Sequence, residues 1–135
     1  MGGAITAYDS NLTVLQVDID GTNSIAPDNV QGGVAFLNLA SGVAKNLEVR
    51  DVYIHDFTGA IASNTIVGVI TAVDAQGEVN ANIDRTTVAR LSNTEVDTQV
   101  NGIGFFSGVF GGFGSGTTNA NVKNATVSEL SNSSG

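Results

Sequence analysis

The chain has 135 residues, of which 41% are apolar and 13% are charged, and it contains no cysteine. That length suits one domain with its own core, and the apolar content excludes a disordered acidic tail. The net charge of −8 disfavours binding to nucleic acid or to an anionic membrane surface. No apolar run is long enough to span a bilayer as a helix. The abundance of Val, Ile, Thr, Asn and Gly favours strands and tight turns.

The first predicted element is a short strand that follows a glycine and occurs four times. These strands cover 3–8, 33–38, 68–73 and 104–109. The second and fourth positions after the glycine pair a large residue with a small one in Ile5/Ala7, Ala35/Leu37, Ile70/Ala72 and Phe106/Gly108. Residues two apart on a strand share a face, so these pairs are predicted to fill a narrow interior. The column between them, Thr6, Phe36, Thr71 and Ser107, is predicted to face outward, with Phe36 under a loop.

The second element begins with asparagine. The pattern Asn-[Leu/Ile/Val]-x-x-x-x-Val starts at Asn11, Asn46, Asn82 and Asn121, at spacings of 35, 36 and 39 residues, and ends at Val17, Val52, Val88 and Val127. A separation of five residues between the two apolar positions does not fit strict alternation, so a bend is predicted between them. A third short strand is then expected around each of these valines, with turns near Gly21, Gly59, Asn93 and Asn132.

Three short strands per repeat, stacked unit over unit, predict an all-β fold of the parallel β-helix type. We expect about four rungs of roughly 35 residues in one solenoid domain over 1–135, with a right-handed coil. The alternative is a β-sandwich, which does not explain why the spacing from each of the first three repeated asparagines to the next strand-opening glycine is constant. Neither end of the sequence shows a capping element. We therefore expect either a segment of a longer repeat protein or a self-assembling subunit.

The repeated asparagines are predicted to form a structural ladder. In this interpretation Asn11, Asn46, Asn82 and Asn121 lie one above another and hydrogen-bond along the stack, because the amide carries both donors and an acceptor. Three asparagines, Asn11, Asn124 and Asn132, also begin glycosylation sequons. Asn124 and Asn132 are expected to be exposed, whereas Asn11 is expected to turn into the ladder.

The segment around Asp18 and Asp20 resembles the start of a calcium-binding loop. Alternating carboxylates before a glycine can wrap a hard cation, but the bidentate Glu of such loops is missing and the nearest downstream acid is Asp28. A polar turn is the preferred interpretation. No other cofactor is expected.

His55 is the only histidine and is flanked by Asp51 and Asp56. The repeat stacks it over Asp20, and a His–Asp pair could do acid–base chemistry. Asp51 and Asp56 are an odd number of residues apart, so on a strand their side chains would point to opposite faces. They are therefore not expected to converge together on His55, and a surface histidine is expected instead.

Further acids are scattered near the arginines Arg85 and Arg90, namely Asp51, Asp56, Asp74, Asp84 and Asp97. They are expected to form a solvated face rather than a sugar-cleaving groove. The glycine-rich segment 102–116 lacks the Lys and helix of a phosphate loop and is predicted to be a strand plus an insertion. Its aromatic residues, Phe105, Phe106, Phe110 and Phe113, could form an adhesive or packing patch.

The openings Gly2-Gly3-Ala4-Ile5 and Gly32-Gly33-Val34 resemble the GGA-[Ile/Leu/Val] repeats of polymorphic outer-membrane and autotransporter-like adhesins. The companion Phe-x-x-Asn motif of that family is absent, and the later repeats keep a single glycine. The resemblance implies an extracellular or cell-surface location and a structural or adhesive role. It carries over no catalytic, cofactor or metal residue.

The favoured hypothesis is a non-enzymatic structural or adhesive module of a surface protein or filament, whose partners are copies of itself or neighbouring repeats. The first alternative is a carbohydrate-active β-helix, acting as a lyase, hydrolase or epimerase. It would require clustered acids and a base on one face. The second alternative, an ice-binding solenoid, would require regular threonine columns, which the column Thr6, Phe36, Thr71 and Ser107 does not provide.

Overall fold

The computed structural model describes residues 2–22, 30–39, 42–59, 65–73, 77–94, 99–107 and 116–132. All regular elements in these ranges are β-strands, arranged in three sheets. Sheet A contains β1 (Gly2–Tyr8), β4 (Val30–Asn38), β8 (Thr65–Val73) and β11 (Gln99–Ser107). Sheet B contains β2 (Leu12–Leu15), β5 (Ala44–Arg50), β9 (Glu78–Asp84) and β12 (Thr117–Lys123). Sheet C contains β3 (Asp18–Asp20), β6 (Tyr53–His55), β7 (Thr58–Gly59), β10 (Thr87–Asn93) and β13 (Thr126–Asn132).

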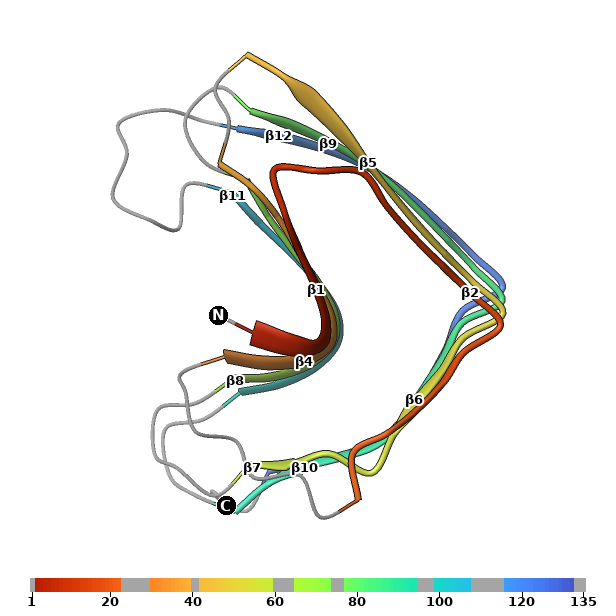
Figure 1. Ribbon diagram of the computed structural model, residues 1–135. Helices are drawn as coiled ribbons and strands as arrows, with labels where there is room; N and C mark the ends of the chain where they lie inside the picture. Colours follow the sequence, from red (N-terminus) through yellow and green to blue (C-terminus); the bar gives the residue numbers. More distant parts are fainter. Residues whose placement is uncertain are drawn as a thin grey trace.

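The chain visits sheets A, B and C in the same order four times. Each visit adds strands beside the preceding ones, and neighbouring strands in the described ranges pair in parallel. We call one visit a rung: β1–β3, β4–β7, β8–β10 and β11–β13 are rungs 1 to 4. Equivalent strands overlap when the molecule is viewed along the stack (Figure 1). The predicted all-β class is confirmed, and parallel pairing does not fit the antiparallel sandwich.

A sharp corner joins sheet B to sheet C in every rung. The corner residues are Gln16, Asp51, Arg85 and Asn124, whose φ angles are 53°, 56°, 45° and 49°. A single left-handed residue redirects the chain between two strands, which explains the irregular five-residue separation in the sequence. The predicted bend between sheets B and C is therefore confirmed.

The main core lies between the three sheets and is built from stacked columns of similar side chains. Sheet B contributes Val14, Val49 and Ile83, and sheet C contributes Ile19, Ile54 and Val88. These side chains are at most 6% exposed. Burying a β-branched residue at the same position in successive rungs stabilises the stack without any disulfide.

In rungs 2 and 3, sheet A is buried on both faces, contrary to the prediction of one outward face, whereas Thr6 of rung 1 is exposed as predicted. Phe36 is fully buried in the main core with Val34, so its predicted outward position is wrong. Of the residues predicted for the interior, Ala35, Leu37, Ile70 and Ala72 form a separate buried cluster with Val67, whereas Ile5 and Ala7 pack against the main core as predicted. The physical reason is a bend at Gly33, where an added Cβ would lie 2.4 Å from Ile54 Cγ2. Gly33 and the next residue both face the core there, which shifts the alternation by one position.

The predicted alignment of the repeated glycines is correct only for rungs 2 and 3. Gly33 lies beside Gly68 in the register of β4 and β8, as predicted. Gly3, however, pairs with Gly32, and Gly104 pairs with Ile70, so both were misaligned. No helix in the described ranges is long and apolar enough to cross a membrane.

Candidate functional site

The outer face of sheet B carries an asparagine ladder on its surface. The backbone N–H of Asn46 donates to Asn11 Oδ1 at 2.9 Å, and Asn80 Nδ2 donates to Asn46 Oδ1 at 3.4 Å. Asn119 Nδ2 then donates to Asn80 Oδ1 at 3.0 Å. In each bond the asparagine of the higher rung is the donor, so the ladder has a direction.

The predicted membership of this ladder is wrong after its first two members. Asn46 pairs in register with Asn80, not with Asn82. Asn82 and Asn121 form a second, shorter column, joined by a hydrogen bond of 3.1 Å from Asn121 Nδ2 to Asn82 Oδ1. A shift of two residues keeps every side chain on its face, so the hydrophobic pattern does not distinguish the two registers.

The three sequon asparagines all lie on the surface. Asn124 and Asn132 are exposed as expected. Asn11 is exposed as well, because the ladder runs along the outside of sheet B rather than into the interior.

An ion-paired column follows the corner between sheets B and C. Arg85 of rung 3 binds Asp51 of rung 2 in a bidentate manner, with Nε–Oδ1 and Nη2–Oδ2 distances of 2.6 and 2.9 Å. This hydrogen bonding lowers the pKa of the Asp51 carboxyl. Asn124 of rung 4 donates to Asp84 at 2.9 Å. The expected solvated charged face is therefore an ordered set of contacts between rungs.

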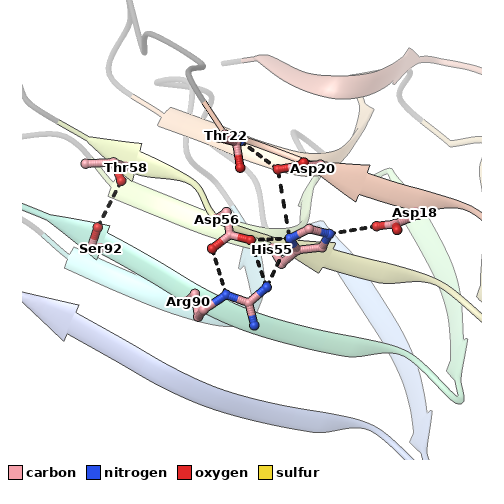
Figure 2. A network of polar contacts seen from close by, with 8 residues as sticks. All are labelled: Asp18, Asp20, Thr22, His55, Asp56, Thr58, Arg90 and Ser92. Carbon is pink, nitrogen blue, oxygen red and sulfur yellow. Dashed lines mark hydrogen bonds and ion pairs between the residues drawn. The ribbon is translucent and has the colours of Figure 1, made fainter.

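The densest polar cluster surrounds His55 on the outer face of sheet C (Figure 2). His55 Nε2 lies 2.7 Å from Asp18 Oδ1, and its Nδ1 contacts Asp56 Oδ2. The Tyr53 ring stacks on the imidazole, with centroids 4.2 Å apart. His55 is 9% exposed, so the prediction of a surface histidine is wrong. Its predicted position opposite Asp20 is confirmed.

Arg90 extends this cluster into rung 3. Its Nε and Nη2 donate to the two carboxylate oxygens of Asp56, each at 2.7 Å. Its guanidinium also lies over the Tyr53 ring at 5.8 Å. Asp18, His55, Asp56 and Arg90 thus form one chain of contacts across three rungs, which we call the His55 clamp. The sequence signal that could have identified Arg90 is its 34-residue offset from Asp56.

The electrostatics of the clamp favour a charged imidazole. The pKa of His55 is raised, chiefly by its hydrogen bond to Asp56 and further by Asp18, although burial opposes the rise. The pKa of Asp56 is lowered by hydrogen bonds from Arg90 and His55. The pKa of Asp20 is also lowered, mainly by hydrogen bonding from Thr22, whose N–H lies 2.8 Å away. When the imidazole is protonated, Nε2 donates to Asp18 and Nδ1 donates to Asp56, and Arg90 Nη2 lies 3.2 Å from Nδ1.

This arrangement does not favour a resident cation. Asp20, His55 and Asp56 offer ligand atoms within 4.8 Å of one another. However, the guanidinium of Arg90 already binds both oxygens of Asp56, so a cation would have to compete with Arg90 for this carboxylate. Calcium near Asp18 and Asp20 remains a sequence prediction, and Asp28 lies outside the described residues.

A polar groove of about 520 Å³ borders the clamp. Its lining residues are Thr22, Asp56, Thr58, Arg90, Ser92, Glu129, Leu130 and Ser131. The hydroxyls of Thr58 and Ser92 lie 3.1 Å apart, one above the other (Figure 2). The groove offers hydroxyl and charged groups to a polar ligand.

Several residues singled out in the sequence lie outside the described ranges: Asp74, Asp97, Phe110 and Phe113. Comparison of the chain with protein-family models, curated proteins and solved structures finds no match.

Proposed function

We propose that this chain is a parallel β-helix that acts as a non-enzymatic structural module and is extended through the exposed edge of rung 4. The repeated passage through sheets A, B and C with parallel pairing throughout supports the β-helix. The right-handed sense and the extracellular or cell-surface location remain expectations from general topology and from the adhesin resemblance.

The observation that carries this proposal is the exposure of interior-type side chains in rung 4. Leu130 pairs in register with Leu91, yet Leu130 is 38% exposed and Leu91 is fully buried. Phe105, Val122 and Val127 are exposed to a similar extent. Three parallel strand edges beside an apolar surface provide a ready template for further strands.

The polar groups support a structural role rather than catalysis. The most prominent charged side chains bind a partner in a neighbouring rung, as Arg85 binds Asp51 and Arg90 binds Asp56. The imidazole of His55 has carboxylates at both nitrogens, so it offers no free base to a substrate. These contacts hold rungs together instead of converging on one reacting atom.

The test is the solution mass of the chain by light scattering, with electron microscopy of the same sample. We expect the mass to grow with concentration and elongated particles to form. Val127→Lys places a charge on the open apolar surface and should keep the chain monomeric. Ser131→Lys places the same charge on the outer face, and this variant should still assemble. A mass that stays monomeric at every concentration would contradict the proposal.

The polar groove favours a second candidate function, which is binding or cleavage of a carbohydrate. Its hydroxyls and the carboxylate of Glu129 suit a ligand rich in hydroxyl groups. Release of reducing ends from a panel of polysaccharides, compared between the natural chain and Glu129→Gln, tests this candidate. For an ice-binding surface, the column Thr6, Ala35, Ile70 and Gly104 of sheet A supplies no threonine array.

A further inference from the structure

We propose that the occupant of the open edge of rung 4 is rung 1 of a second copy of this chain, stacked head to tail in the register that relates the rungs within one copy. This inference rests on the proposed function and specifies its partner. In this arrangement, rung 1 of the second copy lies where a fifth rung would lie.

The apolar columns continue across such a junction. Val122 stands at the top of the column that starts at Val14, and Val127 at the top of the column that starts at Ile19. Head-to-tail stacking therefore sets Val122 on Val14 and Val127 on Ile19 of the second copy. In sheet A it sets the large Phe105 over the small Ala7, which avoids overlap.

The asparagine ladder has matching ends. The higher asparagine donates in each bond, so Asn119 Oδ1 at the top is left as an acceptor among the described contacts. At the bottom, Asn11 accepts from Asn46 through Oδ1, which leaves its Nδ2 as a donor. Stacking Asn11 of the second copy above Asn119 lets that amide donate downward, in the direction of every other bond of the ladder.

The outer face of sheet C is complementary in hydrogen bonding. Thr126 and Ser128 end the columns that begin with Asp18 and Asp20. Head-to-tail stacking therefore places hydroxyl donors opposite two carboxylates. Head-to-head contact would instead bring Asp18 and Asp20 of both copies together, which is repulsive. A head-to-tail interface that repeats the rise between rungs moves each copy further along the stack, so it generates an open filament rather than a closed ring.

Cysteine crosslinking tests the register directly, because the natural chain has no cysteine. The columns set Asn121 of one copy over Thr13 of the next. Paired residues on neighbouring parallel strands are about 4.8 Å apart, within reach of a disulfide. We expect an equimolar mixture of Thr13→Cys and Asn121→Cys to form a disulfide-linked dimer under mild oxidation. Both positions are exposed, so an unchanged unfolding temperature of each reduced variant confirms folding.

Three controls make the result decisive. Thr13→Cys alone links only head-to-head pairs, and Asn121→Cys alone links only pairs of rung 4. Leu15→Cys mixed with Asn121→Cys keeps the same face but is displaced by two residues, and it should crosslink about tenfold less. Assembly in light scattering without crosslinking in the first mixture, or efficient crosslinking of either single variant, would overturn this inference and leave the proposed function intact. Absence of any assembly would overturn both.

Discussion

At the scale of single residues, the corners combine two roles in one side chain. Asp51, Asp56, Arg85 and Arg90 all have positive φ and all take part in ion pairs between rungs. Left-handed backbone costs a non-glycine residue about 1–2 kcal/mol. The same geometry that turns the chain therefore also aims the charged group at the rung above or below.

Gln16 allows the cost of the corner to be measured without changing a charge. Its φ is 53° and its side chain is exposed. We expect Gln16→Gly to be more stable than Gln16→Ala by about 0.5–1 kcal/mol, because glycine relieves the strain while alanine keeps it. Urea denaturation of the two variants measures the difference. If Gln16→Ala were the more stable variant, the corner would not be strained.

The His55 clamp predicts an optimum of stability in mildly acidic solution. Because the pKa of His55 is raised, the stabilisation from its imidazolium is complete below about pH 6.5, its ordinary value, and is lost as the pH rises through the folded pKa. The lowered pKa values of Asp20 and Asp56 give stabilisation that is present above about pH 3.8 and is lost as the pH falls. Melting temperatures should therefore be highest between these limits.

His55 is the only histidine, so a proton NMR titration reports its pKa without assignment. We expect a value above 6.5, and Asp18→Asn should lower it by removing one of the two carboxylates. A titration midpoint at or below 6.5 in the natural chain would show that the clamp does not hold a charged imidazole.

Leu91 and Leu130 allow the stabilisation gained by burying a leucine to be compared at two equivalent positions. They occupy the same column one rung apart, but only Leu91 is fully buried. Leu91→Ala should lower the free energy of unfolding by about 2–5 kcal/mol, and Leu130→Ala by less than about 1.5 kcal/mol in dilute, unassembled protein. Denaturant unfolding at low concentration measures both, and equal losses would mean that rung 4 is covered within one copy.

At the scale of the elements, the bend in sheet A depends on glycines that face the core. A Cβ on Gly68 would lie 2.5 Å from Val88 Cγ1 and 2.6 Å from the carbonyl oxygen of Gly102. Gly68→Ala should therefore cost about 1–3 kcal/mol by overpacking, since a backbone oxygen cannot rotate away. Gly42→Ala is the control, because Gly42 has a φ of 72° and nothing near an added Cβ. This change adds backbone strain without a steric clash and should lower the free energy of unfolding by less than Gly68→Ala. A tolerated Gly68→Ala would show that sheet A can shift.

The sequence predicts the elements of this fold better than their register. Val88 and Val127 lie in the third strand of their rungs as predicted, whereas Val17 and Val52 directly precede β3 and β6. The bend before the third strand is also confirmed. The alignment failed from rung 2 to rung 3, where Val88 pairs with Ile54 rather than with Val52. A slip of two residues preserves every inward and outward position, so only contacts such as Asn46 to Asn80 distinguish the registers.

The candidate site shows the same limit of sequence reasoning. That His55 lies opposite Asp20 follows from the repeat, because the offset of 35 residues is constant through sheets B and C of these two rungs. The burial of the His55 imidazole and the contacts of Arg90 with Asp56 could not be predicted from the repeat. They depend on the left-handed turn at Asp56 and on Tyr53, whose ring packs against the imidazole. Backbone turns by residues other than glycine leave little trace in a sequence.

At the scale of the whole molecule, each rung pairs only with its immediate neighbours. Stability is then approximately a sum of rung terms and junction terms, so the outermost rungs should open first. The strands of rung 3, β8–β10, have partners on both sides, whereas those of rung 4, β11–β13, have a described partner only in rung 3. Local opening is therefore expected to begin at the open edge.

Hydrogen exchange tests this picture of a one-dimensional stack. In dilute protein, amides of β8–β10 should exchange more slowly than the equivalent amides of β11–β13, because opening rung 4 breaks one junction and opening rung 3 breaks two. In concentrated, assembled protein the protection of rungs 1 and 4 should rise toward that of rungs 2 and 3, since the new junction joins those two ends. Val127→Lys should abolish this rise without changing β8 or β9. Equal protection of all four rungs in the dilute protein would instead mean that the stack opens as a single cooperative unit.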